Sequence, residues 1–333
     1  MTNNDEIQQL KEFSLKIQLL RERISKVIVG QDQIVQELII TLIAQGHLLL
    51  VGVPGLAKTL LISTVAQLFD LRFNRVQFTP DLMPSDIIGT EVLEKKGDEK
   101  SFRFIRGPVF CNLLLADEIN RTPPKTQSAL LQAMQEYRIS YSGVTYPLDK
   151  PFFVLATQNP IELEGTYPLP EAQLDRFMLN SVVSYPSFEE EVEIMKRTTG
   201  DEITALEPIL LKDDILNIQA LVRRIPVSDF VIEYATRIVT GSRPDCNKED
   251  NMIKNYVSWG AGPRATQSLI LSSKALAAIR GKTFVEIDEI KTMAYSVLRH
   301  RILLNFSADS ENIRVEDIIS HLLQIKFQSN HAN

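Results

Sequence analysis

Apolar residues follow two different spacings along the chain, and the change between them predicts three regions. In region 1–27 they recur every three to four positions, which predicts one amphipathic helix. In region 28–186 short, continuous apolar runs alternate with segments of helical period, whereas region 187–333 has helical periods alone. The pattern therefore predicts an N-terminal helix that packs on the domain after it, then a mixed domain, then a helical domain.

The middle region is typical of a parallel sheet with crossover helices. Most of its apolar runs have the length of strands and are largely apolar, as expected for strands covered on both faces. The expected strands are 47–51, 73–78, 112–116, 152–157 and 180–183, and the expected helices include 32–45, 58–69 and 126–135. Five parallel strands between two helical layers predict a three-layer αβα fold.

The last region shows no convincing ladder of strands. Segments with a helical period lie at 188–197, 213–224, 228–240, 264–280 and 287–299. We therefore predict that the second domain is all-helical.

Composition excludes several classes of protein. With 333 residues, 36 Lys+Arg and 42 Asp+Glu, the formal net charge is −6, which disfavours a broad nucleic-acid footprint. A hydrophobic content of 44% excludes a disordered or collagen-like chain. Cys111 and Cys246 cannot build a disulfide framework, and the first residues lack the pattern of a secretory signal. Since no apolar run approaches the ~20 residues of a membrane helix, we expect a cytoplasmic protein without a membrane span.

The strongest chemical signal is a glycine loop, GVPGLAKT, between the first expected strand and the next helix. In this context glycines turn backbone N–H groups around phosphate oxygens, Lys58 neutralises phosphate charge, and the Thr59 hydroxyl is a ligand for Mg²⁺. A tight turn without a ligand has the same local pattern, and the glycine that usually precedes the lysine is replaced here. The candidate nucleotide-binding residues of the loop are Gly52, Pro54, Gly55, Leu56, Ala57, Lys58, Thr59 and Leu60.

Two adjacent acids, Asp117 and Glu118, follow the third expected strand. Strand ends of an open parallel sheet face the ligand crevice. Asp117 is therefore a candidate for holding Mg²⁺, and Glu118 for orienting or deprotonating the water that attacks a γ-phosphate. Without the glycine loop, the pair would be an ordinary solvated loop after a core strand.

Five motifs together resemble those of a MoxR-type AAA+ ATPase of the helix-2-insert clade. They are GVPGLAKT, NLLLADEINRTPPKTQSALLQAMQE, ATQNP, LPEAQLDRF and GPRA, and they span most of residues 28–275. The resemblance implies a P-loop NTPase core with a small helical AAA+ lid, ATP and Mg²⁺ as ligands, and ATP hydrolysis at the subunit interfaces of a ring, most often a hexamer. It also implies a chaperone-like role in maturing or activating protein complexes, with von Willebrand factor A-type proteins among the usual partners.

The same resemblance assigns roles outside the glycine loop. Asn159 in ATQNP matches sensor 1, Arg176 in LDRF matches the arginine finger that reaches the neighbouring subunit, and Arg264 in GPRA matches sensor 2. Gly30 and Gln31 match the segment that lines the adenine pocket.

These roles have simpler alternatives. The Asn-Pro pair is a common turn after a strand. Arg176 has Asp175 and Glu171 nearby in sequence as intrasubunit ion-pair partners, and Arg264 is also compatible with a surface position. Segments 86–108 and 138–148 predict two hairpins, which in ring motors often face the pore and contact a partner, and which are otherwise passive edges.

Three functions remain open from the sequence. The leading one is an ATP-driven remodeller of protein complexes, because the loop lysine, the two acids, Asn159 and both arginines occur together. A nucleic-acid motor is the alternative, since related AAA+ rings include DNA helicases, and the negative charge argues against it. A module that uses ATP as an assembly switch with little turnover is the third.

Overall fold

The computed structural model describes residues 4–53, 55–56, 58–96, 99–160, 165–199, 206–246 and 249–324. The chain forms two compact units. An α/β unit comprises Leu15–Phe177 and Ser181–Gln219, and a helical unit comprises Met1–Ser14, Met178–Asn180 and Ala220–Asn333.

A five-stranded sheet with the strand order β2-β5-β8-β1-β9 forms the centre of the α/β unit. The strands are β1 (Leu48–Gly52), β2 (Phe73–Gln77), β5 (Leu113–Asp117), β8 (Phe153–Gln158) and β9 (Leu179–Val183). Strand β1 pairs with β8, β8 with β5, and β5 with β2, all in parallel. The five predicted strands are confirmed to within one residue at each end.

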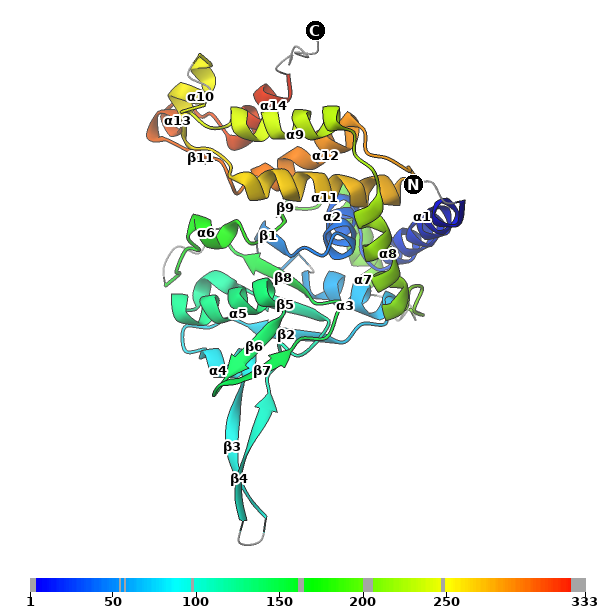
Figure 1. The fold of residues 1–333 in the computed structure, drawn as a ribbon, viewed down its shortest axis with the longest axis vertical. Coiled ribbons are helices and arrows are strands. Elements are labelled where there is room, and N and C mark those ends of the chain that lie inside the picture. Colours follow the sequence, from blue (N-terminus) through cyan, green and yellow to red (C-terminus); the bar gives the residue numbers. More distant parts are fainter. Residues whose placement is uncertain are drawn as a thin grey trace. The chain divides into compact units, whose positions relative to one another are not determined.

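Helices cover both faces of this sheet. The α-helices that lie wholly within the α/β unit are α2 (Asp32–Ile43), α3 (Lys58–Leu68), α4 (Pro84–Ile88), α5 (Pro124–Glu136), α6 (Glu171–Leu174) and α7 (Phe188–Thr198). One face, which includes Leu49, Leu114 and Val154, packs on α5 through Leu130 and Met134. The alternate residues of each strand point to the other face, where Figure 1 shows α2 and α3. Burial on both faces explains why β1, β5 and β8 are largely apolar, whereas the edge strand β2 carries polar residues.

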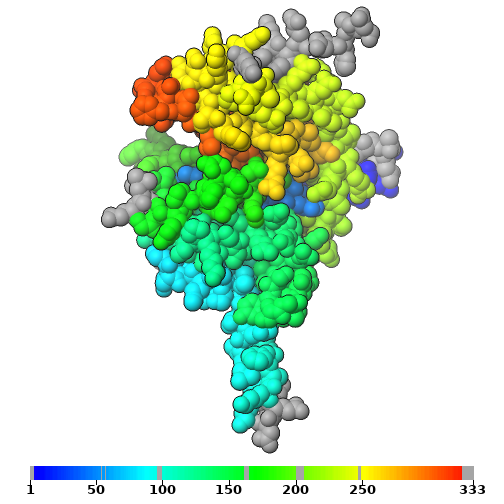
Figure 2. All heavy atoms as spheres, turned by 60° about the vertical axis from the view of Figure 1, so that its left-hand side comes forward, coloured from blue at the N-terminus to red at the C-terminus, as the bar shows by residue number. Residues whose placement is uncertain are grey.

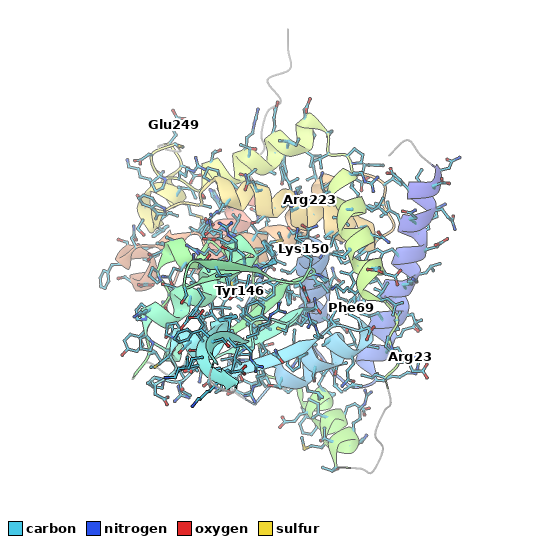
Figure 3. The ribbon with its side chains drawn as sticks, turned by 60° about the horizontal axis from the view of Figure 1, so that its bottom comes forward. Arg23, Phe69, Tyr146, Lys150, Arg223 and Glu249 are labelled. Carbon is cyan, nitrogen blue, oxygen red and sulfur yellow. The ribbon has the colours of Figure 1, made fainter. Side chains whose placement is uncertain are left out.

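Two antiparallel hairpins extend the α/β unit. The longer one consists of β3 (Gly89–Lys96) and β4 (Glu99–Arg106), and the shorter one of β6 (Arg138–Tyr141) and β7 (Val144–Pro147). The β3–β4 hairpin projects from its unit as a narrow ribbon (Figure 2). Phe104 at its base stacks on Tyr146 of β7, with ring centroids 4.3 Å apart. Tyr146 is labelled in Figure 3. Both predicted hairpins are confirmed. In the longer one the sequence indicates strand-like runs only at 91–93 and 102–105, and the observed strands extend well beyond them.

In its described residues the helical unit contains the start of α1 (Asn4–Ser25), the end of α8 (Lys212–Arg224) and six further helices. The six are α9 (Asp229–Gly241), α10 (Asn251–Tyr256), α11 (Pro263–Ile279), α12 (Ile287–Leu298), α13 (Phe306–Ser310) and α14 (Val315–Gln324). The prediction of an all-helical domain needs a correction, because β10 (Val257–Trp259) and β11 (Leu303–Leu304) form an antiparallel pair. Strands of three and two residues are too short to show an alternating pattern.

The division into units differs from the predicted boundaries after residues 27 and 186. Helix α1 contributes to both units: Ser14 Oγ donates to Ile279 O at 2.8 Å, and Arg224 pairs with Glu6 at 2.7 Å, so the first part belongs to the helical unit. Helix α7 belongs to the α/β unit, where it lines the cavity described below. No helix among the described residues is long and apolar enough to cross a membrane.

Candidate nucleotide-binding site

The glycine loop connects β1 to α3, with Gly52 as the last strand residue and Lys58 as the first helical one. A Cβ on Gly52 would lie 2.8 Å from the Cβ of Val183, so packing requires glycine there. Gly55 has a φ of +84°, which L-residues rarely adopt, and the space where its Cβ would point is open. The loop is therefore held tightly at its base and has free space at its turn. Two predicted loop residues, Pro54 and Ala57, lie outside the described residues.

Lys58 folds back over this loop. Its Nζ donates to the Gly52 carbonyl O at 2.5 Å, and its side chain is half-buried. Burial lowers the pKa of Lys58 from its ordinary value, while the charges of Asp117 and Glu118 act in the opposite direction. The ammonium group thus lies near both acids and beside the backbone that would surround a phosphate.

A cavity of about 340 Å³ opens beside the loop within the α/β unit. Small-molecule pockets generally measure roughly 300–1,000 Å³. Gly30 and Gln31, which the resemblance assigned to the adenine pocket, line this cavity. Gln31 Nε2 also donates to the Leu56 carbonyl O at 3.0 Å, which ties the two segments together. The lining includes Val27, Ile28, Val29, Gly30, Gln31, Gly55, Leu56, Leu60, Tyr185, Ile194 and Met195.

Asp117 has both carboxylate oxygens engaged at the end of β5. Thr157, on the neighbouring strand β8, donates its hydroxyl proton to Asp117 Oδ1 at 2.7 Å. Arg75, on the other neighbour β2, donates to Asp117 Oδ2 from Nη2 at 2.7 Å and from Nε at 3.2 Å. The carboxylate is therefore fixed from both sides of its strand.

Glu118 follows in a left-handed backbone conformation, with φ 58° and ψ 49°. Its N–H donates to Thr157 Oγ1 at 2.8 Å. Its Oε2 accepts from Gln77 Nε2 at 2.6 Å and from Arg121 Nη1 at 2.9 Å. The carboxylate of Glu118 is thus held by one amide and one guanidinium of its own chain.

Arg75 and Gln77 are contacts that the sequence did not single out. The only available signal was their spacing, since two polar residues two positions apart on a strand share one face. The register of β2 against β5 brings these two residues to Asp117, because Gln77 lies opposite Asp117 and Arg75 lies opposite Leu115.

The other predicted site residues occupy three different places. Asn159 is buried directly after β8, one residue beyond its end. Arg176 Nη1 donates to the Leu131 carbonyl O at 2.9 Å, and its buried Nε has no hydrogen-bond partner in the described structure. Among the described residues no carboxylate forms an ion pair with Arg176, so the alternative pairing with Asp175 or Glu171 is not observed.

Arg264 belongs to the helical unit. It is the second residue of α11, directly after Pro263. The α/β unit by itself therefore assembles the loop, both acids and the cavity without Arg264, and the assignment of that arginine to sensor 2 stays a prediction.

The residues proposed for Mg²⁺ carry suitable ligand atoms. Thr59 offers a hydroxyl from the first turn of α3, and Asp117 a carboxylate. Mg²⁺ prefers oxygen ligands and usually takes one or two from protein, with phosphates and water completing its shell. The donor set thus fits Mg²⁺ bound together with a nucleotide.

Two family models and one close relative identify the protein's family. Residues 47–179 match the ATPase family associated with various cellular activities (AAA), and residues 249–322 match the AAA lid domain. The chain is 44% identical over 301 residues to chaperone MoxR1 of Mycobacterium tuberculosis, covering 90% of this chain and 79% of that protein. The chain belongs to the MoxR-type AAA+ ATPases.

Two further likenesses agree with this MoxR-type assignment. The chain is 40% identical over 303 residues to the uncharacterized protein YeaC of Bacillus subtilis, covering 91% of each. A crystal structure described as a putative ATPase from Cytophaga hutchinsonii superimposes with a TM-score of 0.90 at 41% identity, over 97% of this chain and 98% of that one. The predicted class, a P-loop α/β core with a helical AAA+ lid, is confirmed for this MoxR-type protein.

Proposed function

We propose that this MoxR-type protein binds ATP with Mg²⁺ and hydrolyses it at the subunit interfaces of a hexameric ring. One observation carries the proposal: Lys58, Asp117 and Glu118 lie at one end of the sheet, close enough for both acids to act on the charge of Lys58. The cavity beside Gly55 and Leu56 adds space for a base next to the phosphate loop.

Each group has a distinct task in this proposal. The backbone N–H groups of residues 52–60 and the Lys58 ammonium bind the phosphates, and Gly30 and Gln31 contact the adenine. Glu118 orients or deprotonates the attacking water, and Asn159 helps to position it. Thr59 and Asp117 would hold Mg²⁺, which when bound neutralises charge on the β- and γ-phosphates.

Arg176 is proposed as the finger that acts on the neighbouring subunit, with Arg264 as sensor 2 in the same subunit. The described hydrogen bonding of Arg176 supports this, since the side chain is only partly buried and its bond to Leu131 O uses one of five guanidinium N–H groups. A guanidinium supplied across an interface can raise the hydrolysis rate by roughly 10³ to 10⁵.

The biological role is proposed by likeness to its relatives. MoxR1 is described as a chaperone, and we infer that this protein also remodels or activates a protein complex, in the cytoplasm. A client with a von Willebrand factor A-type domain is the partner that the family resemblance suggests. The net charge of −6 favours a protein partner over nucleic acid.

The test measures the rate of ATP hydrolysis per subunit against protein concentration. The samples are wild type, Glu118→Gln, Arg176→Ala, and a mixture of the two variants, with Glu22→Gln, an exposed glutamate on α1, as the control. We expect wild type and control to be equally active and each site variant to be inactive. The mixture should regain activity, because some interfaces then pair an intact Glu118 with an intact Arg176.

Three results would contradict parts of this proposal. If Arg176→Ala hydrolyses ATP at the wild-type rate, Arg176 is not an arginine finger. If the rate per subunit stays constant down to concentrations at which sedimentation shows only monomer, hydrolysis does not require a subunit interface. Tight ATP binding and ring formation without turnover by the wild type would instead support an assembly switch.

A further inference from the structure

Thr157 lies between the two acids of the site and contacts both of them. It is the fifth residue of β8, one strand away from β5, and it is buried with 1% of its surface exposed. The same oxygen, Oγ1, serves both contacts: it donates to Asp117 Oδ1 at 2.7 Å and accepts from the Glu118 N–H at 2.8 Å. One hydroxyl therefore links the side chain of one acid to the backbone of the next.

These two bonds use the hydroxyl in complementary ways. A threonine hydroxyl has one proton to donate and two lone pairs that accept. Because its proton goes to Asp117 and a lone pair faces Glu118, the χ1 rotamer of Thr157 is fixed by both partners at once. No other side chain type of the same shape can make this pair of bonds, since valine has the shape without the hydroxyl.

The bond to Glu118 supports an unfavourable backbone conformation. Glu118 adopts φ 58° and ψ 49°, and for a residue with a Cβ the left-handed region costs roughly 1–2 kcal/mol. Such a conformation persists where surrounding contacts determine it, and it is frequent at functional sites. Here it turns the chain directly after β5, so that the Glu118 carboxylate meets Gln77 and Arg121.

We propose that Thr157 is a positioning residue for ATP hydrolysis: its hydroxyl holds the Asp117 carboxylate for Mg²⁺ and fixes the backbone turn that aims Glu118. This inference rests on the proposed ATPase function. It differs from the water-positioning role proposed for Asn159, because Thr157 acts through the two acids and touches neither substrate nor water in this role.

The experiment compares three variants of the full-length protein. Thr157→Val removes the hydroxyl and keeps the shape, and Thr157→Ser keeps the hydroxyl. The matched control is Thr41→Val on α2, because Thr41 is fully buried and its hydroxyl donates to the Glu37 carbonyl O, away from the acids. The measurements are kcat and KM for ATP, and the affinity for a fluorescent ADP analogue in EDTA and across a Mg²⁺ titration.

For Thr157→Val we expect kcat to fall by about 10- to 100-fold, with a change in KM below about threefold, because the variant misplaces groups that act in the transition state. The affinity for the ADP analogue in EDTA should stay unchanged. The Mg²⁺ concentration that gives half of the Mg²⁺-dependent change in ADP-analogue binding should rise at least about threefold. Thr157→Ser should recover kcat to within about threefold of wild type. Thr41→Val should match wild type in every measurement.

Several outcomes would overturn the inference. Thr157→Val with the kcat and Mg²⁺ dependence of wild type would do so, as would a serine variant as impaired as the valine one. If kcat and the affinity for the ADP analogue in EDTA fall by the same factor, the substitution has damaged the site in general. If Thr157→Val does not fold, Thr157→Ala removes the same hydroxyl and takes its place under the same criteria. A wild type without hydrolysis overturns the proposed function itself, whereas an active wild type with an equally active valine variant overturns only this inference.

Discussion

Arg75 occupies the oxygen of Asp117 that Thr157 leaves available. The Arg75 side chain is 46% exposed, whereas the Asp117 side chain is 15% exposed, so the pair lies at the edge of the site rather than inside the core. Under the proposed function, Mg²⁺ and Arg75 both interact with the same carboxylate. The ion pair then acts as a competitor to Mg²⁺ whenever the metal is scarce.

Replacing Arg75 should therefore strengthen the response to Mg²⁺. Ion pairs of this exposure contribute about 0.2–1 kcal/mol, so we expect Arg75→Gln to lower the Mg²⁺ concentration for half-maximal nucleotide binding by about two- to fivefold. A Mg²⁺ titration with the fluorescent ADP analogue measures this. Arg72→Gln is the control, since Arg72 forms a comparable exposed ion pair with Asp149. An unchanged or higher Mg²⁺ requirement for Arg75→Gln would show that the pair organises the site instead of competing.

At this scale the sequence predicted the residues that belong to motifs and missed those that do not. Lys58, Asp117 and Glu118 could be found because loop chemistry and strand ends have a recognisable order along the chain. Arg75 and Gln77 could not, because their importance comes from the register of β2 against β5, which is a tertiary property. The absence of an ion pair at Arg176 among the described residues was also beyond sequence reasoning, which left that pairing open.

His47 lies directly before β1 and forms hydrogen bonds to β8 and to α5. Its Nδ1 accepts from the Val154 N–H and its Nε2 donates to the Met134 carbonyl O, both at 3.1 Å. The proton of the neutral ring is therefore on Nε2, since Val154 supplies the proton at the other nitrogen. Full burial lowers the pKa of His47 from 6.5 to about 4.

This arrangement makes stability depend on pH. Between pH 6.5 and about 4 the unfolded chain binds a proton at His47 and the folded chain does not, so stability falls as the pH falls through this window, by up to about 3 kcal/mol. We expect urea unfolding of wild type to show this loss. In His47→Gln, whose side chain does not titrate, the loss should be smaller, and the difference between the two profiles separates His47 from the carboxylates. Parallel profiles would contradict the prediction.

At the scale of elements, hydrophobic patterning predicted most of the fold. Most of the strands were predictable because they are short, largely apolar runs between turn signals, as in Leu113–Asp117. The β10–β11 pair was not, since two or three residues carry no periodic signal and their partners lie about 45 residues apart in sequence. The length of the β3–β4 hairpin was also missed, because charged residues near its turn are typical of a loop as well as of an exposed ribbon.

At the scale of the whole molecule, the two units share three continuous elements. The assignment to units changes within α1 after Ser14, within β9 after Asn180, and within α8 after Gln219. Such a division is not visible in a sequence pattern, because a helix keeps its period on both sides of the change. The predicted boundaries after residues 27 and 186 assumed that each element belongs to one unit.

Shared elements should make unfolding cooperative across both units. When one unit loses its structure, α1, β9 and α8 lose part of their support, so we expect a single transition. Hydrogen exchange at increasing urea, followed by mass spectrometry, can test this. Peptides from β5 and β8 in the α/β unit and from α11 and α12 in the helical unit should reach the same opening free energy. Separate limiting values for the two sets would show that the units unfold independently.

The β3–β4 ribbon has a mechanical consequence. Its base is rigid: Phe104 stacks on Tyr146, and a Cβ on Gly89 would lie 2.3 Å from the Ile105 carbonyl O. With eight residues in each strand, it is about 26 Å long at roughly 3.3 Å per residue. A stiff arm of that length multiplies rotation, so a turn of about 10° at its base would carry its tip through about 4–5 Å. Small angular changes in the α/β unit thereby become displacements as large as the spacing between neighbouring strands.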